Sequence, residues 1–191
     1  YDTWYAQPSY FVLGAIWYGL TSVLFYLIKP TQAVQDNLAE CFNQLAQLLH
    51  VKSQLFDPDN TNNVEALLYD LSIQNSQVVQ SLNHCKASLL TRLKASRANK
   101  KTIYWLNLYF LAQDIHEQAT SNYLHYEKIN LNFSRTDLIY RIQKNIRLQA
   151  KHCQLLAQSI LQAEHFQLPE QNPIALQHLQ KSMQDWIQDN P

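Results

Sequence analysis

The sequence contains almost no glycine: of its 191 residues, only Gly14 and Gly19 are glycine. Two-residue hairpin turns depend on the positive φ angles that glycine adopts easily, so a chain without glycine after residue 19 is poorly suited to hairpin-connected strands. Leucine and glutamine are frequent and runs of β-branched residues are few, which favours helix. The sequence therefore predicts an all-α protein and argues against an all-β or α/β fold.

Cysteine and charge are also scarce. Cys41, Cys85 and Cys153 form no CxxC pair and are odd in number, which favours reduced, buried thiols over a disulfide framework. Charged residues make up 16% of the chain, below the roughly 25% usual in soluble domains. The 15 basic and 15 acidic residues cancel, and nucleic-acid binders usually carry a basic excess, so no nucleic-acid partner is predicted.

No motif of a phosphate-binding or hydrolytic enzyme is present. Phosphate-cradling loops need glycines that the chain lacks beyond Gly19, and no GxSxG nucleophile motif occurs. His116-Glu117 begins like the zinc motif HExxH, but Thr120 stands where the second histidine belongs. The sequence thus predicts no catalytic residues, no cofactor-binding residues and no metal ligands. The alternative is a hydrolase or metal-dependent enzyme, and one bound zinc ion per chain would support it.

Residues 10–28 form a long stretch without any charge. A helix of this length spans about 28 Å, close to the roughly 30 Å hydrocarbon core of a bilayer. A secretory signal would carry a basic residue before its apolar part, yet no Lys or Arg precedes Lys29. We therefore predict a transmembrane helix, rather than a buried core helix or a signal peptide. The residues that mark this span are Tyr10, Gly14, Ala15, Gly19, Ser22 and Ile28.

The predicted span carries signs of neighbouring helices. Ala15 and Gly19 form a small-xxx-small pair, which lets another helix approach closely. Trp17 and Tyr18 lie in mid-span, away from the interfacial level that such aromatics prefer in lipid. We expect this helix to pack against other transmembrane helices of the same protein.

The orientation of the span follows from the basic residues that flank it. Lys29 follows the apolar stretch and no basic residue precedes it, which favours a cytoplasmic location for residues 30–191. The unpaired cysteines agree with a reducing compartment. Because the chain begins at Tyr1, without methionine, directly before this span, we expect it to be a fragment of a larger protein.

Beyond Pro30, apolar residues recur at spacings of three and four, the pattern of amphipathic helices. A stretch rich in Asn and Asp at 57–63 interrupts this pattern, because such residues favour turns. Long helices joined by short connections become antiparallel neighbours. We predict an up-and-down bundle of about five long helices, at residues 31–56, 64–96, 101–128, 134–165 and from 172 onward.

The turn between the second and third of these helices is strongly basic. Its basic residues, with no acid among them, are Arg92, Lys94, Arg97, Lys100 and Lys101. In a bundle that starts at a membrane, this turn returns toward the bilayer, where each basic residue near anionic headgroups contributes about 1 kcal/mol. Contact with lipid headgroups is one interpretation, and a solvated turn between helices is the other.

A polar cluster lies in the third predicted helix. If the second and third helices form a hairpin that turns near Ala98-Asn99, Asp114 comes close to His84. Buried polar side chains that satisfy one another fix the register of packed helices. We predict a structural polar network, and not acid-base chemistry, for His84, Asp114, His116 and Glu117.

Several short segments carry more information together than any single motif. They are Trp4-Tyr5-Ala-Gln-Pro8, Ala15-Ile-Trp17-Tyr18, Val34-Gln-Asp36-Asn37-Leu38-Ala39, Leu49 to Asp59, Leu68-Tyr69-Asp70-Leu71, Ser88 to Leu93 and Ala112 to Glu117. In this order along the chain, they resemble the YccS/YhfK family of FUSC-like bacterial inner-membrane proteins, named for similarity to fusaric acid resistance pumps. The resemblance extends to about Leu161, and little beyond Phe166 matches.

The resemblance implies a larger protein with two membrane blocks, each followed by a cytoplasmic helical region. Residues 1–29 are then the last transmembrane helix of the first block. Residues 30–191 are a cytoplasmic helical-bundle domain, truncated at its C-terminus. The expected location is the bacterial inner membrane. The expected partners are the lipid bilayer, the other transmembrane helices of the protein and further copies in a homo-oligomer.

Two functions remain open. The first is a component of an efflux transporter that links the membrane bundle to a cytoplasmic helical domain. Aromatic acids are the substrate class that the resemblance implies, and no catalytic residues carry over. The alternative is a membrane-tethered helical interaction or scaffold module without transport activity. A stoichiometric cytosolic partner of residues 31–191 favours the alternative, whereas self-association alone favours the transporter.

Overall fold

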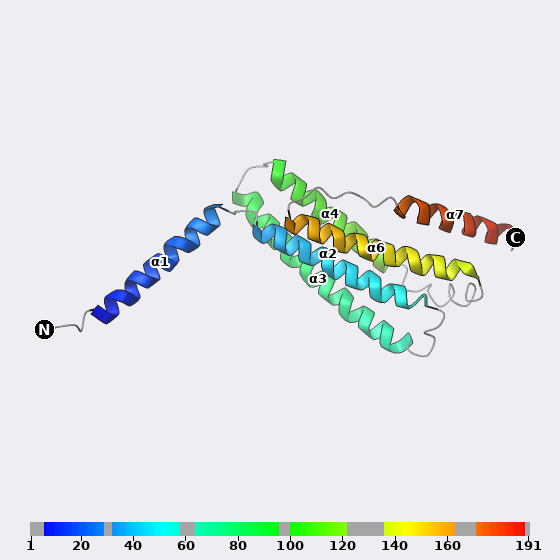
Figure 1. The fold of residues 1–191 in the computed structure, drawn as a ribbon, viewed down its shortest axis with the longest axis horizontal. Helices are drawn as coiled ribbons and strands as arrows, with labels where there is room; N and C mark the ends of the chain where they lie inside the picture. Colours follow the sequence, from blue (N-terminus) through cyan, green and yellow to red (C-terminus); the bar gives the residue numbers. More distant parts are fainter. Residues whose placement is uncertain are drawn as a thin grey trace. The chain divides into compact units, whose positions relative to one another are not determined.

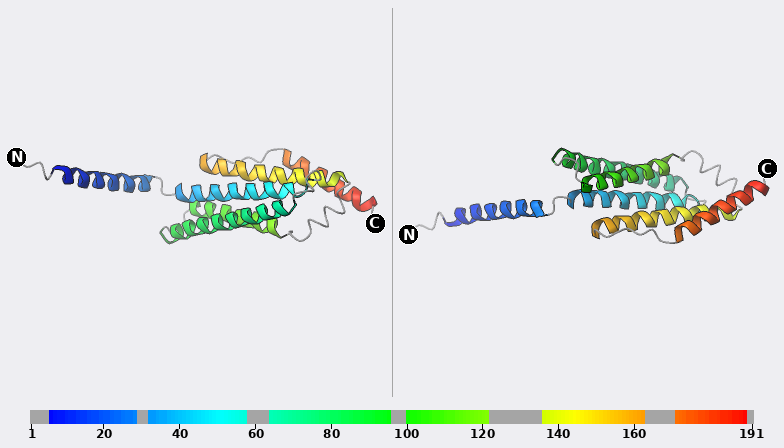
Figure 2. Two further views of the ribbon diagram at one scale, coloured as in Figure 1. Left: turned by 90° about the horizontal axis from the view of Figure 1, so that it is seen from below. Right: turned by 90° about the horizontal axis from the view of Figure 1, so that it is seen from above.

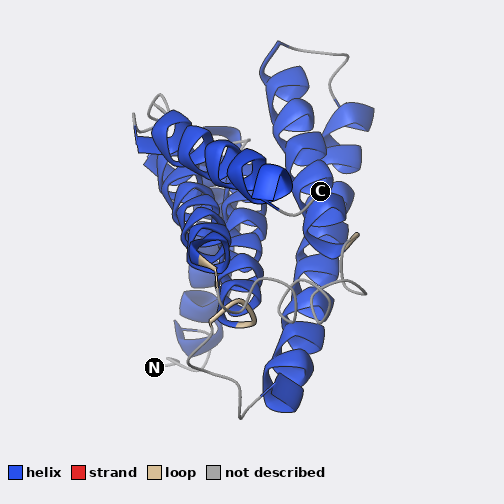
Figure 3. Ribbon diagram, turned by 90° about the vertical axis from the view of Figure 1, so that its right-hand side faces the viewer, coloured by secondary structure: helices blue, strands red, loops and turns tan. Residues whose placement is uncertain are grey.

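The computed structural model describes residues 6–28, 32–57, 64–95, 100–121, 136–162 and 171–189, where helices are the only regular elements (Figure 3). They are α1 (Ala6–Ile28), α2 (Gln32–Gln54), α3 (Val64–Ala95), α4 (Lys100–Thr120), α6 (Asp137–Gln162) and α7 (Gln171–Asp189) (Figure 1). The predicted all-α class is confirmed. The chain divides into two compact units, Tyr1–Ala33 and Val34–Pro191.

The helix limits follow the sequence pattern closely. α2 and α3 begin and end within two residues of the predicted limits, and α6 and α7 begin near theirs. α4 ends at Thr120, and the rest of the helix predicted to reach residue 128 lies outside the described residues from 122 onward. At the end of α2, bonds from the amides of Leu55 and Phe56 to carbonyls three residues earlier tighten the last turn.

α1 presents apolar side chains on every side. All of its described side chains, those of residues 8–24, are exposed, and Phe11 is exposed to 81%. A Cβ atom added at Gly14 or Gly19 would meet nothing within 4 Å. The hydroxyl of Thr21 lies 2.9 Å from the carbonyl oxygen of Trp17, so the helix satisfies this polar group internally.

The transmembrane span predicted at residues 10–28 is not confirmed. In the part of the chain that the structure describes, no helix combines the length and the apolarity needed to cross a bilayer. α1 is helical over 23 residues, and the side chain of Ile28 lies outside its described side chains, those of residues 8–24. The other residues that mark the predicted span are exposed, namely Tyr10, Gly14, Ala15, Gly19 and Ser22.

α2 is the central helix of the second unit. Two opposite views place it between the α3–α4 pair and α6 (Figure 2). Its buried residues lie on two adjacent sides, with Leu38 and Leu45 on one and Ala39 and Ala46 on the other. A helix that packs against one neighbour buries a single stripe, so this wider burial reflects contact with several helices.

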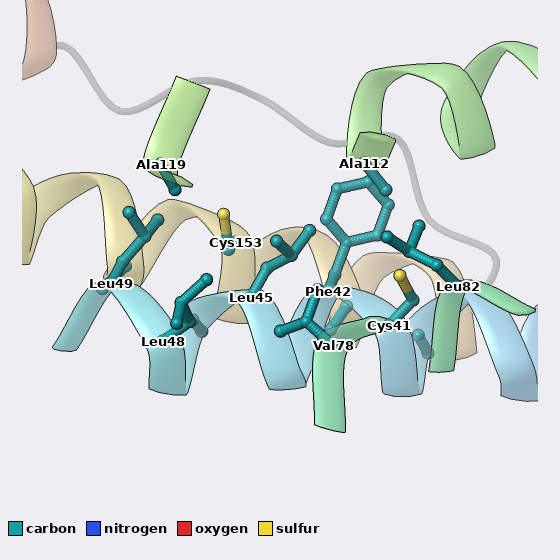
Figure 4. Close-up of a cluster of buried hydrophobic side chains, with 14 of the residues drawn as sticks. Cys41, Phe42, Leu45, Leu48, Leu49, Val78, Leu82, Ala112, Ala119 and Cys153 are labelled. Carbon is teal, nitrogen blue, oxygen red and sulfur yellow. The ribbon is translucent and has the colours of Figure 1, made fainter. Parts of the chain in front are cut away.

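The core of the second unit is built around Phe42 of α2, the largest fully buried side chain. Its ring points toward Ala112 of α4, and Leu82 of α3 lies beside it (Figure 4). The small Ala112 leaves room for the ring, as interdigitated packing requires. The surrounding core contains Val34, Leu38, Leu45, Leu48, Leu71, Val78, Cys85, Leu89, Ile139, Cys153, Ala157 and Ile160.

Candidate functional site

One member of the predicted polar cluster bonds to another helix. Nε2 of His116 on α4 lies 2.7 Å from Oδ1 of Asn75 on α3. Burial lowers the pKa of the half-buried His116 imidazole, which favours the neutral ring. A neutral ring protonated at Nε2 donates to the amide oxygen of Asn75. This bond joins the antiparallel helices α3 and α4.

The other three members of the predicted network are exposed: His84 on α3, and Asp114 and Glu117 on α4. The sequence predicts a hairpin that turns near Ala98-Asn99 and brings Asp114 close to His84. The observed bond instead joins His116 to Asn75, which lies nearer the start of α3. A network of all four residues therefore stays a prediction. Within the described ranges, no three His, Cys, Asp or Glu side chains lie together as metal ligands do.

The basic turn is described only in part. Lys100 and Lys101 begin α4 and are exposed, and Arg92 on α3 is half-buried. The side chain of Lys94 and the whole of Arg97 lie outside the described residues. Positive charge is unfavourable at a helix N-terminus, so the stability of α4 does not account for its two lysines.

The three cysteines are buried in the core and form no disulfide, as the sequence predicts. Burial raises the pKa of the Cys41 and Cys153 thiols to about 11 and that of Cys85 to about 12. Thiols react as thiolates, so protonated and buried thiols are unreactive at neutral pH. They act here as small apolar side chains.

A groove of about 520 Å³ lies between α4 and α6, and α2 also contributes to its wall. Its lining is mostly apolar and consists of Leu49, Leu111, Ile115, Ala119, Ile146, Cys153 and Leu156. The polar groups in its lining are Lys52, Asp114, Gln118, Gln149 and His152. Sequence reasoning missed this groove because its walls come from three distant helices, whose apolar positions read as ordinary core.

Lys52 is the half-buried cation of this groove. Its ammonium group donates to the carbonyl oxygen of Ala119 in the last turn of α4. The last carbonyls of a helix lack partners within the helix, and the negative end of the helix dipole favours a cation there. Lys52 therefore caps α4, and burial lowers the pKa of its ammonium group.

Comparison with known proteins gives a family for the chain. The sequence model of a family described as "FUSC-like inner membrane protein yccS" matches residues 1–191. This match includes the region beyond Phe166, where the sequence reading found little resemblance. No solved structure matches the chain.

Two curated relatives align with most of the chain. Inner membrane protein YccS of Escherichia coli (strain K12) is 42% identical over 161 residues, which are 84% of this chain and 22% of that protein. An uncharacterized protein of Haemophilus influenzae is 33% identical over 159 residues, which are 83% of this chain and 22% of the relative. The chain thus spans about a fifth of the length of these relatives. The predicted resemblance is confirmed, and the chain belongs to the FUSC-like family of inner membrane proteins that includes YccS.

Proposed function

We propose that this chain links a membrane helix to a cytoplasmic helical domain within a FUSC-like inner membrane protein, and that the complete protein is an efflux transporter. The observation that carries the proposal is α1, an uncharged helix whose described side chains are all exposed. Each Å² of apolar surface left in water costs about 25 cal/mol, so α1 requires a bilayer or other helices around it. Family membership among inner membrane proteins supports a bilayer.

Membrane fractionation tests the position of α1. The 191-residue chain should stay in the membrane pellet through an alkaline carbonate wash and leave it only with detergent. Replacing Leu13, Ile16 and Leu20 together by lysine should release the chain from the membrane pellet, because charge in the bilayer core costs roughly 2.5–3.5 kcal/mol per residue. The control replaces the exposed Gln80, Gln113 and Gln154 by lysine, and this variant should stay in the membrane pellet. Release of the unmodified chain by carbonate would contradict the proposed membrane position.

Packing of α1 against other transmembrane helices of the same protein is part of this proposal. The open space beside Gly14 and Gly19 supports it, because glycine lets a second helix approach closely. In the complete protein, Gly19→Leu should reduce the proposed efflux activity, and Gly19→Ala should reduce it less. Equal and full activity of both variants would show that no helix packs there.

Export of aromatic carboxylic acids is the substrate hypothesis that the family resemblance suggests. Cells that lack the complete protein should become sensitive to members of an aromatic-acid panel, and the intact gene should restore resistance. Unchanged sensitivity across the panel would remove this substrate class and leave the linking role of the chain to be judged by the fractionation experiment.

Contact of the basic turn with anionic lipid is a further part of the proposal. The exposed Lys100 and Lys101 at the start of α4 support it. Charge reversal of Arg97, Lys100 and Lys101 should weaken binding to vesicles that contain phosphatidylglycerol. The same number of reversals at Lys144, Lys151 and Lys181, which are exposed elsewhere, is the control. Equal effects of the two triple variants would assign the turn to solvent.

A helical interaction module is the second candidate, and the apolar side chains that α3 and α4 leave exposed allow it to be distinguished from the transporter. Leu90, Ile103 and Phe110 are exposed to 47%, 45% and 51%. We propose that self-association in a homo-oligomer covers them. Replacing Ile103 and Phe110 by glutamate should then reduce the mass of the complex, measured by light scattering. Purification with a stoichiometric cytosolic protein, lost in the same variant, would favour the scaffold function instead.

A further inference from the structure

The groove between α4 and α6 has no assigned role, and its chemistry points to a ligand. We propose that it binds a linear amphiphile with a single carboxylate, a medium-chain fatty acid, whose carboxylate pairs with Lys52. Its volume of about 520 Å³ lies within the range of small-molecule sites, roughly 300–1,000 Å³. An additional helix is about 10–12 Å across with its side chains and is a poor fit to a space of this size.

The groove has one polar end and one apolar end. α4 and α6 run in opposite directions (Figures 1 and 2), so the C-terminal end of α4 meets the N-terminal half of α6. The amides of Gln118 and Gln149, together with Lys52, lie at that end. Leu111 and Leu156 line the other end. A molecule with an anionic head and a hydrocarbon tail matches this order of side chains.

The length of the groove sets the length of the tail. Leu111 and Ala119 are separated along α4 by about 12 Å, the extended length of a chain of about ten carbons. Between these ends the walls contain the apolar Leu49, Ile115 and Cys153, with the polar Asp114 and His152 beside them. Each methylene that leaves water for such walls favours binding.

Lys52 retains the capacity to bind an anion. An ammonium group has three N–H donors, and the bond to Ala119 uses one of them. The half-buried position of Lys52 strengthens its pairing with a carboxylate, because water screens it less. Three other titratable groups line the groove, and one of them is the Cys153 thiol, whose raised pKa keeps it neutral. Asp114 is exposed at its rim, and His152 has a lowered pKa, from burial and the neighbouring Lys151, that favours its neutral form.

Equilibrium dialysis with radiolabelled decanoate tests the site. The 191-residue chain is reconstituted in phosphatidylcholine nanodiscs, and empty nanodiscs give the lipid background. We expect one saturable decanoate per chain, and at least tenfold weaker binding of hexanoate. Lys52→Met should weaken decanoate binding about tenfold, because a charge-assisted bond is lost. Lys86→Met is the matched control, since Lys86 is exposed on α3 and does not line the groove, and it should bind as the unmodified chain does.

A second variant tests the site without touching the cap of α4. Leu111→Trp fills the apolar end, so it should weaken decanoate binding about tenfold and leave hexanoate unchanged. Tyr104→Trp, at an exposed position of α4 outside the groove, is its control. The proposal is overturned if no saturable binding exceeds the empty nanodiscs, if Lys52→Met binds decanoate normally, or if Leu111→Trp weakens both acids equally. If Lys52→Met does not fold by circular dichroism, the chain-length selectivity of Leu111→Trp decides the outcome.

Discussion

Phe42→Ala is the most informative single test of the bundle, because Phe42 is fully buried where three helices meet. A buried phenylalanine removes roughly 150–250 Å² from water, which at about 25 cal/mol per Å² corresponds to about 4–6 kcal/mol. Cavity-forming substitutions of this type cost about 3–5 kcal/mol in practice, because the site relaxes in part. We therefore expect the free energy of unfolding to fall by about 3–5 kcal/mol.

Urea unfolding followed by circular dichroism at 222 nm measures this loss. Tyr69→Ala is the control: it removes an aromatic side chain from an α3 position that is 68% exposed, and should cost about 1 kcal/mol or less. The comparison between the variants cancels any contribution from α1. If Phe42→Ala loses no more free energy of unfolding than Tyr69→Ala, α2 is not the central helix of the folded unit.

Three further predictions follow from the described contacts. The three cysteines should react with iodoacetamide at pH 8 only after unfolding, and rapid labelling of the native chain would contradict their burial. Burial lowers the pKa of His116 in the folded chain, so the unfolded chain binds more protons at this residue. The contribution of neutral His116 to the free energy of unfolding is therefore complete above the ordinary pKa of 6.5 and is lost as pH falls below that value. His116→Gln keeps a donor for Asn75 and should flatten part of this fall, measured as Tm between pH 5 and 7.5; an unchanged slope would contradict the assignment. Asn145 is 4% exposed and neither side-chain polar atom has a hydrogen-bond partner, so Asn145→Leu should raise the free energy of unfolding by about 1–3 kcal/mol, measured in urea; a loss would show that the amide is satisfied.

The helices were predictable because their causes are local. Apolar residues at spacings of three and four, and the Asn-rich interruption after Asp57, determine where α2 ends and α3 begins. The burial of Cys41, Cys85 and Cys153 was also predictable, because each lies on an apolar stripe of its helix. These features depend on residues within a few positions of one another.

The register between helices was not predictable from such local patterns. The pairing of His116 with Asn75, and not of Asp114 with His84, depends on how the side chains of α3 and α4 interlock. A shift of one or two helical turns leaves the apolar stripes facing each other, so periodicity alone does not distinguish the alternatives. The packing of Phe42 against Ala112 belongs to the observed register.

The groove was hidden from sequence reasoning for a related reason. Its apolar residues obey the same periodicity as the core, and only the spacing of α4 from α6 separates a groove from a filled interior. Lys52 was a possible signal, because a lysine near the apolar stripe of α2 requires a partner. That partner, the carbonyl oxygen of Ala119, is distant in sequence and belongs to the backbone.

The lack of glycine and proline within α2, α3, α4 and α6 has a mechanical consequence. Sharp bends in helices arise mainly at such residues, so these four helices behave as rigid rods. α3, with 32 residues, extends about 48 Å. A displacement at one of its ends therefore reaches the other end as a shift or rotation of the whole helix against its neighbours, and does not dissipate in a local hinge.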